Sequence, residues 1–266
     1  MKAAVCSYIS ALSLVVLLPF CGGGIDRGSI DDVGSDAVTY QTEDGVRIVA
    51  GWFVPPGETK FPVVILLHEQ DGSRGQWNEL IPILVHEGYA VLAPDLRGFG
   101  DSNIIIHDGQ EEPYEFSNPK DAIKDVAAAI QWLKSRNDVD PSRTSVIGAR
   151  LGADLAYVST GTFPEVKAAV AMTPSRHTAE DPLLTSIPDF AAHDVCLMAG
   201  GEQQWEGAVS LGIRIQNPGG RRYVDHPDLD GVALLTIDDP IKDILGWLKE
   251  RVLGGEDTPA CTANSG

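Results

Sequence analysis

Apolar runs alternate with amphipathic segments along the middle of the chain, and this alternation predicts an α/β fold. The continuous apolar run at 61–67 is typical of a parallel strand buried on both faces. Residues 89–93 predict the next buried strand, and 166–172 predict a further strand. Between them, segments at about 76–87 and 119–134 carry apolar residues at helical spacing. We therefore predict a mostly parallel central sheet with helices on both faces.

The segments on either side of this central part add further strands and helices to the predicted fold. Strand patterns at 38–42 and 46–54 flank Glu43-Asp44-Gly45, which predicts an N-terminal antiparallel hairpin. Further elements follow toward the C-terminus: strands at 195–199 and 222–224 and an amphipathic helix at 241–252. Residues 103–118 show no regular period and are expected to be irregular.

The segment 144–156 has the most specific local pattern. A β-branched run ends at Gly148, and an Ala- and Leu-rich helical pattern begins after Gly152. Small residues on both sides of Arg150 permit a sharp turn from strand to helix, as in a nucleophile elbow. Arg150 itself stays protonated at ordinary pH and cannot attack a carbonyl.

Composition narrows the class of protein. The chain has 266 residues, of which 43% are hydrophobic, enough for one α/β domain with a sizeable core. The formal net charge of −18 argues against nucleic-acid binding, which needs clustered Lys and Arg. The four cysteines have no zinc-site spacing, and we expect neither a metal nor a cofactor.

The first 21 residues are typical of a targeting segment. A positive charge at Lys2 precedes an apolar run that is too short to span a bilayer comfortably. The four residues that end at Cys21 resemble a bacterial lipobox, although Pro19 and Phe20 depart from that pattern. We therefore predict a signal peptide of the lipoprotein type, with an ordinary secretory signal as the alternative.

This interpretation predicts export to the bacterial cell envelope and attachment to the membrane through a lipid on Cys21. Because Gly22 follows the cysteine, the pattern implies the outer membrane if the source is Gram-negative. The predicted divisions of the chain are a signal peptide at 1–21, a flexible acidic tether at 22–36, the α/β domain at 37–253 and a polar tail at 254–266.

Three stretches resemble the α/β-hydrolase superfamily, and within it the dienelactone-hydrolase-like esterases. They are 63–68, 88–102 and 139–143, the last of which leads into the elbow. Their order and spacing imply the α/β-hydrolase fold for about residues 40–253. The resemblance also implies a carboxylic ester hydrolase with a Ser-His-Asp triad.

The triad positions that the resemblance implies carry other residues. The nucleophile position holds Arg150, the acid position falls at about Gln204, and the histidine position holds Asp230. Glu202 and His226 are candidate substitutes for the acid and the base. Because triad members act as a unit, these replacements favour a pseudoenzyme.

The implied oxyanion hole is also altered. One donor would be the backbone amide of Leu151, and the other would come from the loop after the first central strand, where Glu69 replaces the usual glycine. A carboxylate there opposes stabilisation of an oxyanion. The alternative remains a hydrolase that uses Glu202, or Asp230 with His226 and a water molecule.

The replacements at the elbow are complementary in charge. We predict that Arg150 forms an ion pair with Asp230, Glu69 or both, and that a buried pair would make its removal cost a few kcal/mol. The alternative is an open cationic pocket for a carboxylate or phosphate. In either case the former active-site cleft is the expected place for a small-molecule or protein ligand.

Overall fold

The computed structural model describes residues 24–57, 60–175, 191–200, 202–215, 220–226 and 229–254, and for residues 202–204 only the backbone. The strands are β1 (Ser35–Gln41), β2 (Val46–Phe53), β3 (Phe61–Leu67), β4 (Ala90–Pro94), β5 (Ile104–His107), β6 (Gln110–Pro113), β7 (Val139–Ala149), β8 (Val166–Met172), β9 (Val195–Ala199) and β10 (Arg221–Asp225). The α-helices are α1 (Leu80–His86), α2 (Ile123–Lys134), α3 (Leu151–Thr162), α5 (Glu202–Gly212) and α6 (Asp238–Val252). Short 3-10 helices include η1 (Ile30–Asp32), η2 (Arg74–Trp77), η3 (Pro119–Ala122) and η5 (Gly231–Thr236).

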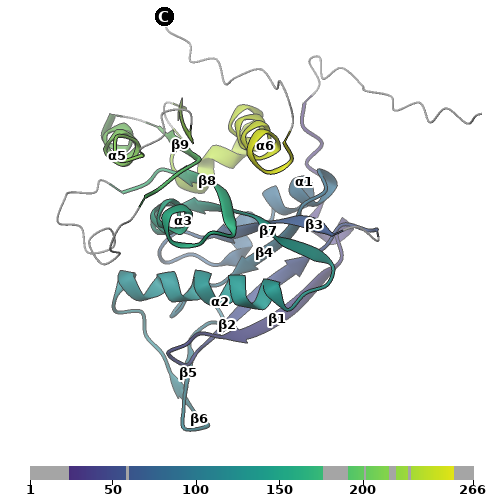
Figure 1. Ribbon diagram of the computed structural model, residues 1–266, viewed down its shortest axis with the longest axis vertical. Coiled ribbons are helices and arrows are strands. Elements are labelled where there is room, and N and C mark those ends of the chain that lie inside the picture. The colour runs from purple at the N-terminus through teal and green to yellow at the C-terminus, as the bar shows by residue number, and fades with distance from the viewer. Residues whose placement is uncertain are drawn as a thin grey trace, which may run out of the picture.

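The strands form one mixed sheet in the order β10-β9-β8-β7-β3-β4-β2-β5-β6, and β1 pairs with β2. The strands from β10 to β4 in this order run parallel, whereas β1, β2, β5 and β6 pair antiparallel. Helices α2, α3 and α5 pack on one face, and α1 and α6 pack on the other (Figure 1). The predicted parallel sheet, covered on both faces, is confirmed.

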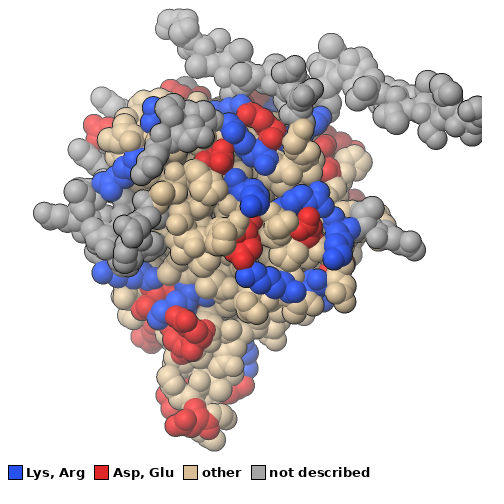
Figure 2. Space-filling model, viewed as in Figure 1, with Lys and Arg blue, Asp and Glu red and all other residues tan. Residues whose placement is uncertain are grey.

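The segment expected to be irregular contains a β-hairpin. Strands β5 and β6 pair with each other, and β5 adds to the sheet beside β2. Asp108 and Gly109 connect them, both with positive φ (49° and 76°), as the tightest hairpin turns require. The hairpin projects from the domain (Figure 1), and acidic side chains lie on this projection (Figure 2).

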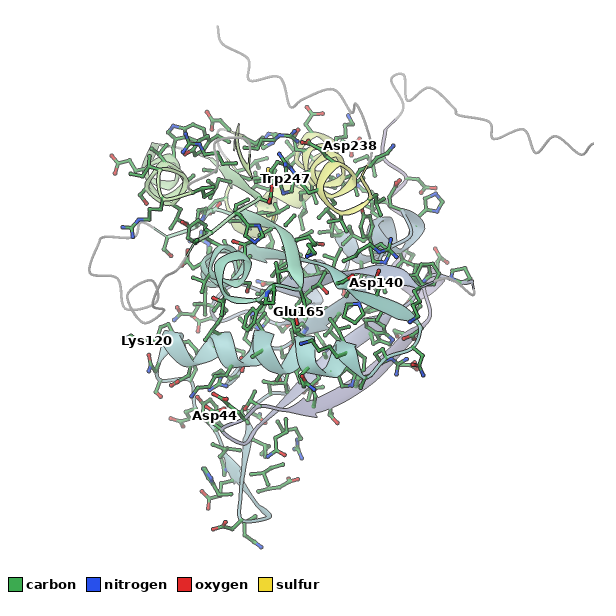
Figure 3. The ribbon with its side chains drawn as sticks, viewed as in Figure 1. Asp44, Lys120, Asp140, Glu165, Asp238 and Trp247 are labelled. Atoms are coloured by element: carbon green, nitrogen blue, oxygen red, sulfur yellow. The ribbon has the colours of Figure 1, made fainter. Side chains whose placement is uncertain are left out.

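The described part of the predicted tether is docked on the domain and is not free. Arg27 donates to the Leu235 carbonyl at 2.6 Å and pairs with Asp238 at 3.0 Å, near the start of α6 (Figure 3). Ile30 and Val33 pack against the core beneath α1 and α6. Strand β1 also begins two residues before the predicted domain boundary at 37. The signal segment, Cys21 and the tail beyond residue 254 lie outside the described residues.

A buried ionic network holds the loop after β4 against α2. The Arg97 side chain is fully buried and donates to Asp125 at 2.7 Å and to Asp44 at 2.9 Å, on the β1–β2 turn (Figure 3). Although burial alone would raise the pKa of Asp44, hydrogen bonds from Arg97, Thr42 and Lys124 hold that pKa well below its usual range. None of the helices in the described part of the chain has the length and hydropathy of a membrane span.

Candidate functional site at the elbow

Arg150 is the single residue between β7 and α3, and its backbone is strained. Its φ of 50° and ψ of −112° lie outside the regions that a side chain with a β-carbon ordinarily adopts. Such a residue costs about 1–3 kcal/mol. The strain is held in place because the Arg150 amide donates to the Met172 carbonyl at 3.0 Å and α3 begins directly afterwards.

Two glycines make the turn sterically feasible. A β-carbon on Gly148 would lie 2.7 Å from the Ala153 nitrogen, and one on Gly152 would lie 2.8 Å from the His68 carbonyl oxygen. Real β-carbons do not approach backbone atoms this closely. The small residues predicted around Arg150 therefore let α3 start against β7 and against the loop that follows β3.

Two carboxylates hold the Arg150 side chain. Its Nη2 forms a close ion pair with Asp230 Oδ2, and its Nε lies 3.7 Å from Glu69 Oε2. The predicted ion pair is confirmed with both partners. The arginine side chain is 50% exposed and that of Asp230 is 33% exposed, so the pair is not buried and the cost of a few kcal/mol expected for a buried pair does not apply.

The charge balance disfavours the open cationic pocket. One guanidinium faces two carboxylates, which gives the three side chains of Arg150, Asp230 and Glu69 a formal charge of −1. An anionic ligand would meet a cation whose charge is already compensated, together with an excess negative charge. The site therefore disfavours a free carboxylate or phosphate.

Asp230 and Glu69 are positioned by contacts with backbone amides at the edge of the sheet where the parallel strands end. Glu69 Oε1 accepts a hydrogen bond from the Val232 amide at 2.8 Å, and the Gly231 amide donates to Thr173 Oγ1 at 2.9 Å. Asp230 directly precedes η5 without a side-chain capping hydrogen bond, and its Oδ1 is buried without a hydrogen-bond partner among the described residues. These contacts join the loops after β3, β8 and β10.

The two predicted oxyanion positions differ in their surroundings. Leu151 is the first residue of α3, so its amide has no acceptor within the helix. The Glu69 amide, in contrast, donates to Gln76 Oε1 at 3.2 Å. The loop after β3 therefore directs this amide to a side chain of η2.

Of the two candidate substitutes, only His226 has a side chain in the described part of the structure, and its ionic partner is not Arg150. The His226 imidazole lies 3.2 Å from Asp243 on α6. Glu202 and Gln204 lie in the first turn of α5, and their side chains are outside the described part. His68 is structural: its buried Nε2 accepts from the Leu96 amide at 2.8 Å, and burial lowers the pKa of its imidazole.

Sequence reasoning missed Thr173 and Gln76, which hold Gly231 and Glu69 in place. Thr173 directly follows β8, at the sheet edge where the site forms, and that position was a usable signal. The sequence contains no signal for the role of Gln76, because that role depends on how η2 is placed against the loop that holds Glu69. In the described residues, no three His, Cys, Asp or Glu side chains gather closely enough to hold a metal ion.

Comparisons with known proteins point to one family. The sequence profile of the dienelactone hydrolase family matches residues 49–203. An uncharacterised protein of Mycobacterium tuberculosis is 32% identical over 143 residues, 53% of this chain and 46% of the relative. The quorum-quenching protein AidA of Acinetobacter baumannii is 27% identical over 138 residues, 52% of this chain and 43% of the relative. The chain spans slightly less than half the length of these curated relatives.

Solved structures show the same fold over most of the chain. The Pyrococcus furiosus esterase Pf2001 superposes with a TM-score of 0.65 at 20% identity, covering 83% of this chain and 94% of the esterase. A dienelactone hydrolase from Anabaena variabilis superposes with a TM-score of 0.62 at 17% identity, covering 83% of this chain and 99% of the enzyme. At these identities the likeness establishes the α/β-hydrolase fold.

Proposed function

The chain belongs to the dienelactone hydrolase family, and we propose that it is a member without the family's hydrolytic chemistry, whose elbow site has a binding or structural role. One observation carries this proposal. Arg150 occupies the strained turn between β7 and α3, and two carboxylates hold its guanidinium. A guanidinium cannot act as a nucleophile at ordinary pH.

The neighbouring groups support the same proposal. Where the family resemblance implies a histidine, Asp230 pairs with Arg150, and a carboxylate held in an ion pair is not available to shuttle a proton as the imidazole of a triad does. The Glu69 amide is engaged by Gln76, which removes one of the two expected oxyanion donors. His226 faces Asp243 on α6.

The proposal includes a location in the cell and a class of partner. We propose that Cys21 carries a lipid anchor that attaches the exported domain to the bacterial cell envelope, at the outer membrane in a Gram-negative source. A protein or small molecule would then bind over the elbow, where Arg150 and Asp230 are partly exposed. No nucleic-acid role is proposed, because the net charge is −18.

A hydrolase that uses non-standard groups is the second candidate, and the family itself favours it. The profile match covers the segment from β2 into α5, and the solved structures above include esterases. In this candidate a carboxylate, Glu202 or Asp230, would activate a water molecule with help from His226. It requires His226 to leave Asp243 and approach the elbow.

An activity test on the purified protein separates the two candidates. We expect no covalent labelling by a fluorophosphonate probe and no turnover of p-nitrophenyl acetate or butyrate above the buffer rate. A catalytically active esterase of the family, treated in parallel, confirms that the probe and the esters work. Labelling in the elbow region, or ester turnover at ordinary enzymatic rates, contradicts the non-catalytic proposal.

Repair variants sharpen this test. Arg150→Ser alone should stay inactive, because Asp230 occupies the position of the base. The triple variant Arg150→Ser, Gln204→Asp, Asp230→His should give weak turnover, because it restores all three chemical types. Substantial activity from the single change would show that His226 already reaches the elbow and serves as the base.

A further inference from the structure

A hollow lies apart from the elbow, on the face of the sheet that carries α1. Its volume is about 470 Å³, and its lining includes none of Arg150, Glu69 or Asp230. Small-molecule sites in proteins measure roughly 300–1,000 Å³. The hollow is therefore large enough for a compact organic ligand, and nothing in the proposed elbow function uses it.

The floor of this hollow is formed where three neighbouring strands carry small residues in register. Ala37 on β1 pairs with Gly51 on β2, and Gly51 pairs with Ala93 on β4. None of these residues has a side chain beyond a β-carbon, so the sheet surface is recessed there. The Phe53 ring lies across Gly51, where a β-carbon would be 2.9 Å from the ring, and Ile81 of α1 forms a wall. The floor is apolar and partly aromatic.

The rim is polar and negatively charged. Arg74 forms ion pairs with both Asp95 and Asp101. Two carboxylates against one guanidinium give these three side chains a formal charge of −1. The Asp95 carboxylate is buried and accepts from the backbone amides of Arg74 at 2.7 Å and Asp101 at 2.9 Å. Asp101 is 65% exposed and remains accessible to a ligand.

We propose that this hollow binds a small organic cation in which an ammonium group is joined to a short apolar or aromatic body. The body would lie on the recessed floor beside Phe53, where it leaves water. The ammonium would lie at the rim near Asp101, where the carboxylates favour it. An anion of the same shape would be repelled by the same rim.

Three probes of nearly equal shape test the charge preference on the full chain: benzylammonium, benzyl alcohol and benzoate, titrated by calorimetry and by saturation-transfer NMR. We expect benzylammonium to bind at least tenfold more tightly than benzoate, with benzyl alcohol between them. Equal binding of benzylammonium and benzoate, or no binding of benzylammonium at millimolar concentration, overturns the proposal.

Variants locate the binding. Ala37→Leu fills the floor from an exposed strand position and should weaken benzylammonium binding at least tenfold. Thr39→Leu is the matched control, because Thr39 lies two residues along the same face of β1, is also exposed and does not line the hollow. Asp101→Asn should weaken binding roughly threefold, as expected for one exposed charge. Unchanged binding in Asp101→Asn and in a folded Ala37→Leu overturns the assignment. If Ala37→Leu does not fold, the Asp101→Asn result alone decides it.

Discussion

Replacing Arg150 by alanine and, separately, by glycine distinguishes the energy of its ion pairs from the energy of its backbone strain. Alanine removes the ion pairs with Asp230 and Glu69 but keeps the strained backbone, which has a φ of 50° and a ψ of −112°. Glycine removes the same pairs and also relieves the strain, because it adopts positive φ freely. The difference in unfolding free energy between the two variants therefore reports the strain.

The magnitudes follow from the exposure and the dihedral angles. Since the Arg150 side chain is 50% exposed, its ion pairs are expected to contribute about 1 kcal/mol or less. The strained conformation costs about 1–3 kcal/mol. Glycine loses roughly 0.5–1 kcal/mol relative to alanine because its unfolded chain is more flexible. We expect Arg150→Ala to be slightly less stable than the wild type, and Arg150→Gly to be about 1 kcal/mol more stable than Arg150→Ala.

Equilibrium unfolding in urea measures both differences, provided that the slopes of the three transitions agree. Lys167, an exposed residue of β8 with ordinary φ, supplies the control: there the glycine variant should be less stable than the alanine variant. If Arg150→Gly is no more stable than Arg150→Ala, the elbow is not strained in solution. If Arg150→Ala loses several kcal/mol, the pair is buried in solution and the observed exposure does not describe it.

Three further outcomes are expected. Gly152→Ala should cost about 3 kcal/mol in urea unfolding through a backbone clash, whereas Gly246→Ala on α6, where a β-carbon meets no atom within 4 Å, should gain up to about 1 kcal/mol. Because the folded pKa of Asp44 lies below its unfolded value of about 3.9, its stabilisation is present above about pH 4 and is lost as the pH falls. Asp44→Asn should therefore lose less stability than the wild type between about pH 5 and pH 2.5, and an equal loss would contradict this. A fatty-acid analogue should label the wild type and not Cys21→Ser. Equal labelling of the two proteins would contradict the proposal that Cys21 carries the lipid.

The fold could be predicted because its strongest signals are local. Strands β3 and β4 are continuous apolar runs, β8 is apolar except for Lys167, and α2 and α6 have apolar residues at helical spacing. The β5–β6 hairpin was missed although its Asp108-Gly109 turn is a strong hairpin signal, because its strands do not alternate cleanly. The docking of Arg27 could not be predicted, since its acceptors on Leu235 and Asp238 are more than 200 residues away along the chain.

The site was predictable in its partners and not in its exposure. Residues that follow parallel strands meet at one sheet edge, which is why the pairing of Arg150 with Asp230 and Glu69 could be expected. The solvent exposure of these side chains depends on the conformation of the surrounding loops, and sequence patterns do not specify that conformation. The same limit hid Gln76, whose contact with the Glu69 amide depends on the path of η2.

The strain at the elbow does not by itself indicate catalysis in this chain. The turn is fixed by Gly148 and Gly152, which let α3 approach the backbone of neighbouring segments, and by the hydrogen bond from the Arg150 amide to Met172. These constraints involve backbone atoms only, so they keep the geometry whatever side chain the turn carries. Chemistry is decided by the groups that the turn presents, here a guanidinium between two carboxylates. The architecture that positions a nucleophile can therefore persist as a scaffold for an ion pair, at a cost that the glycine variant measures.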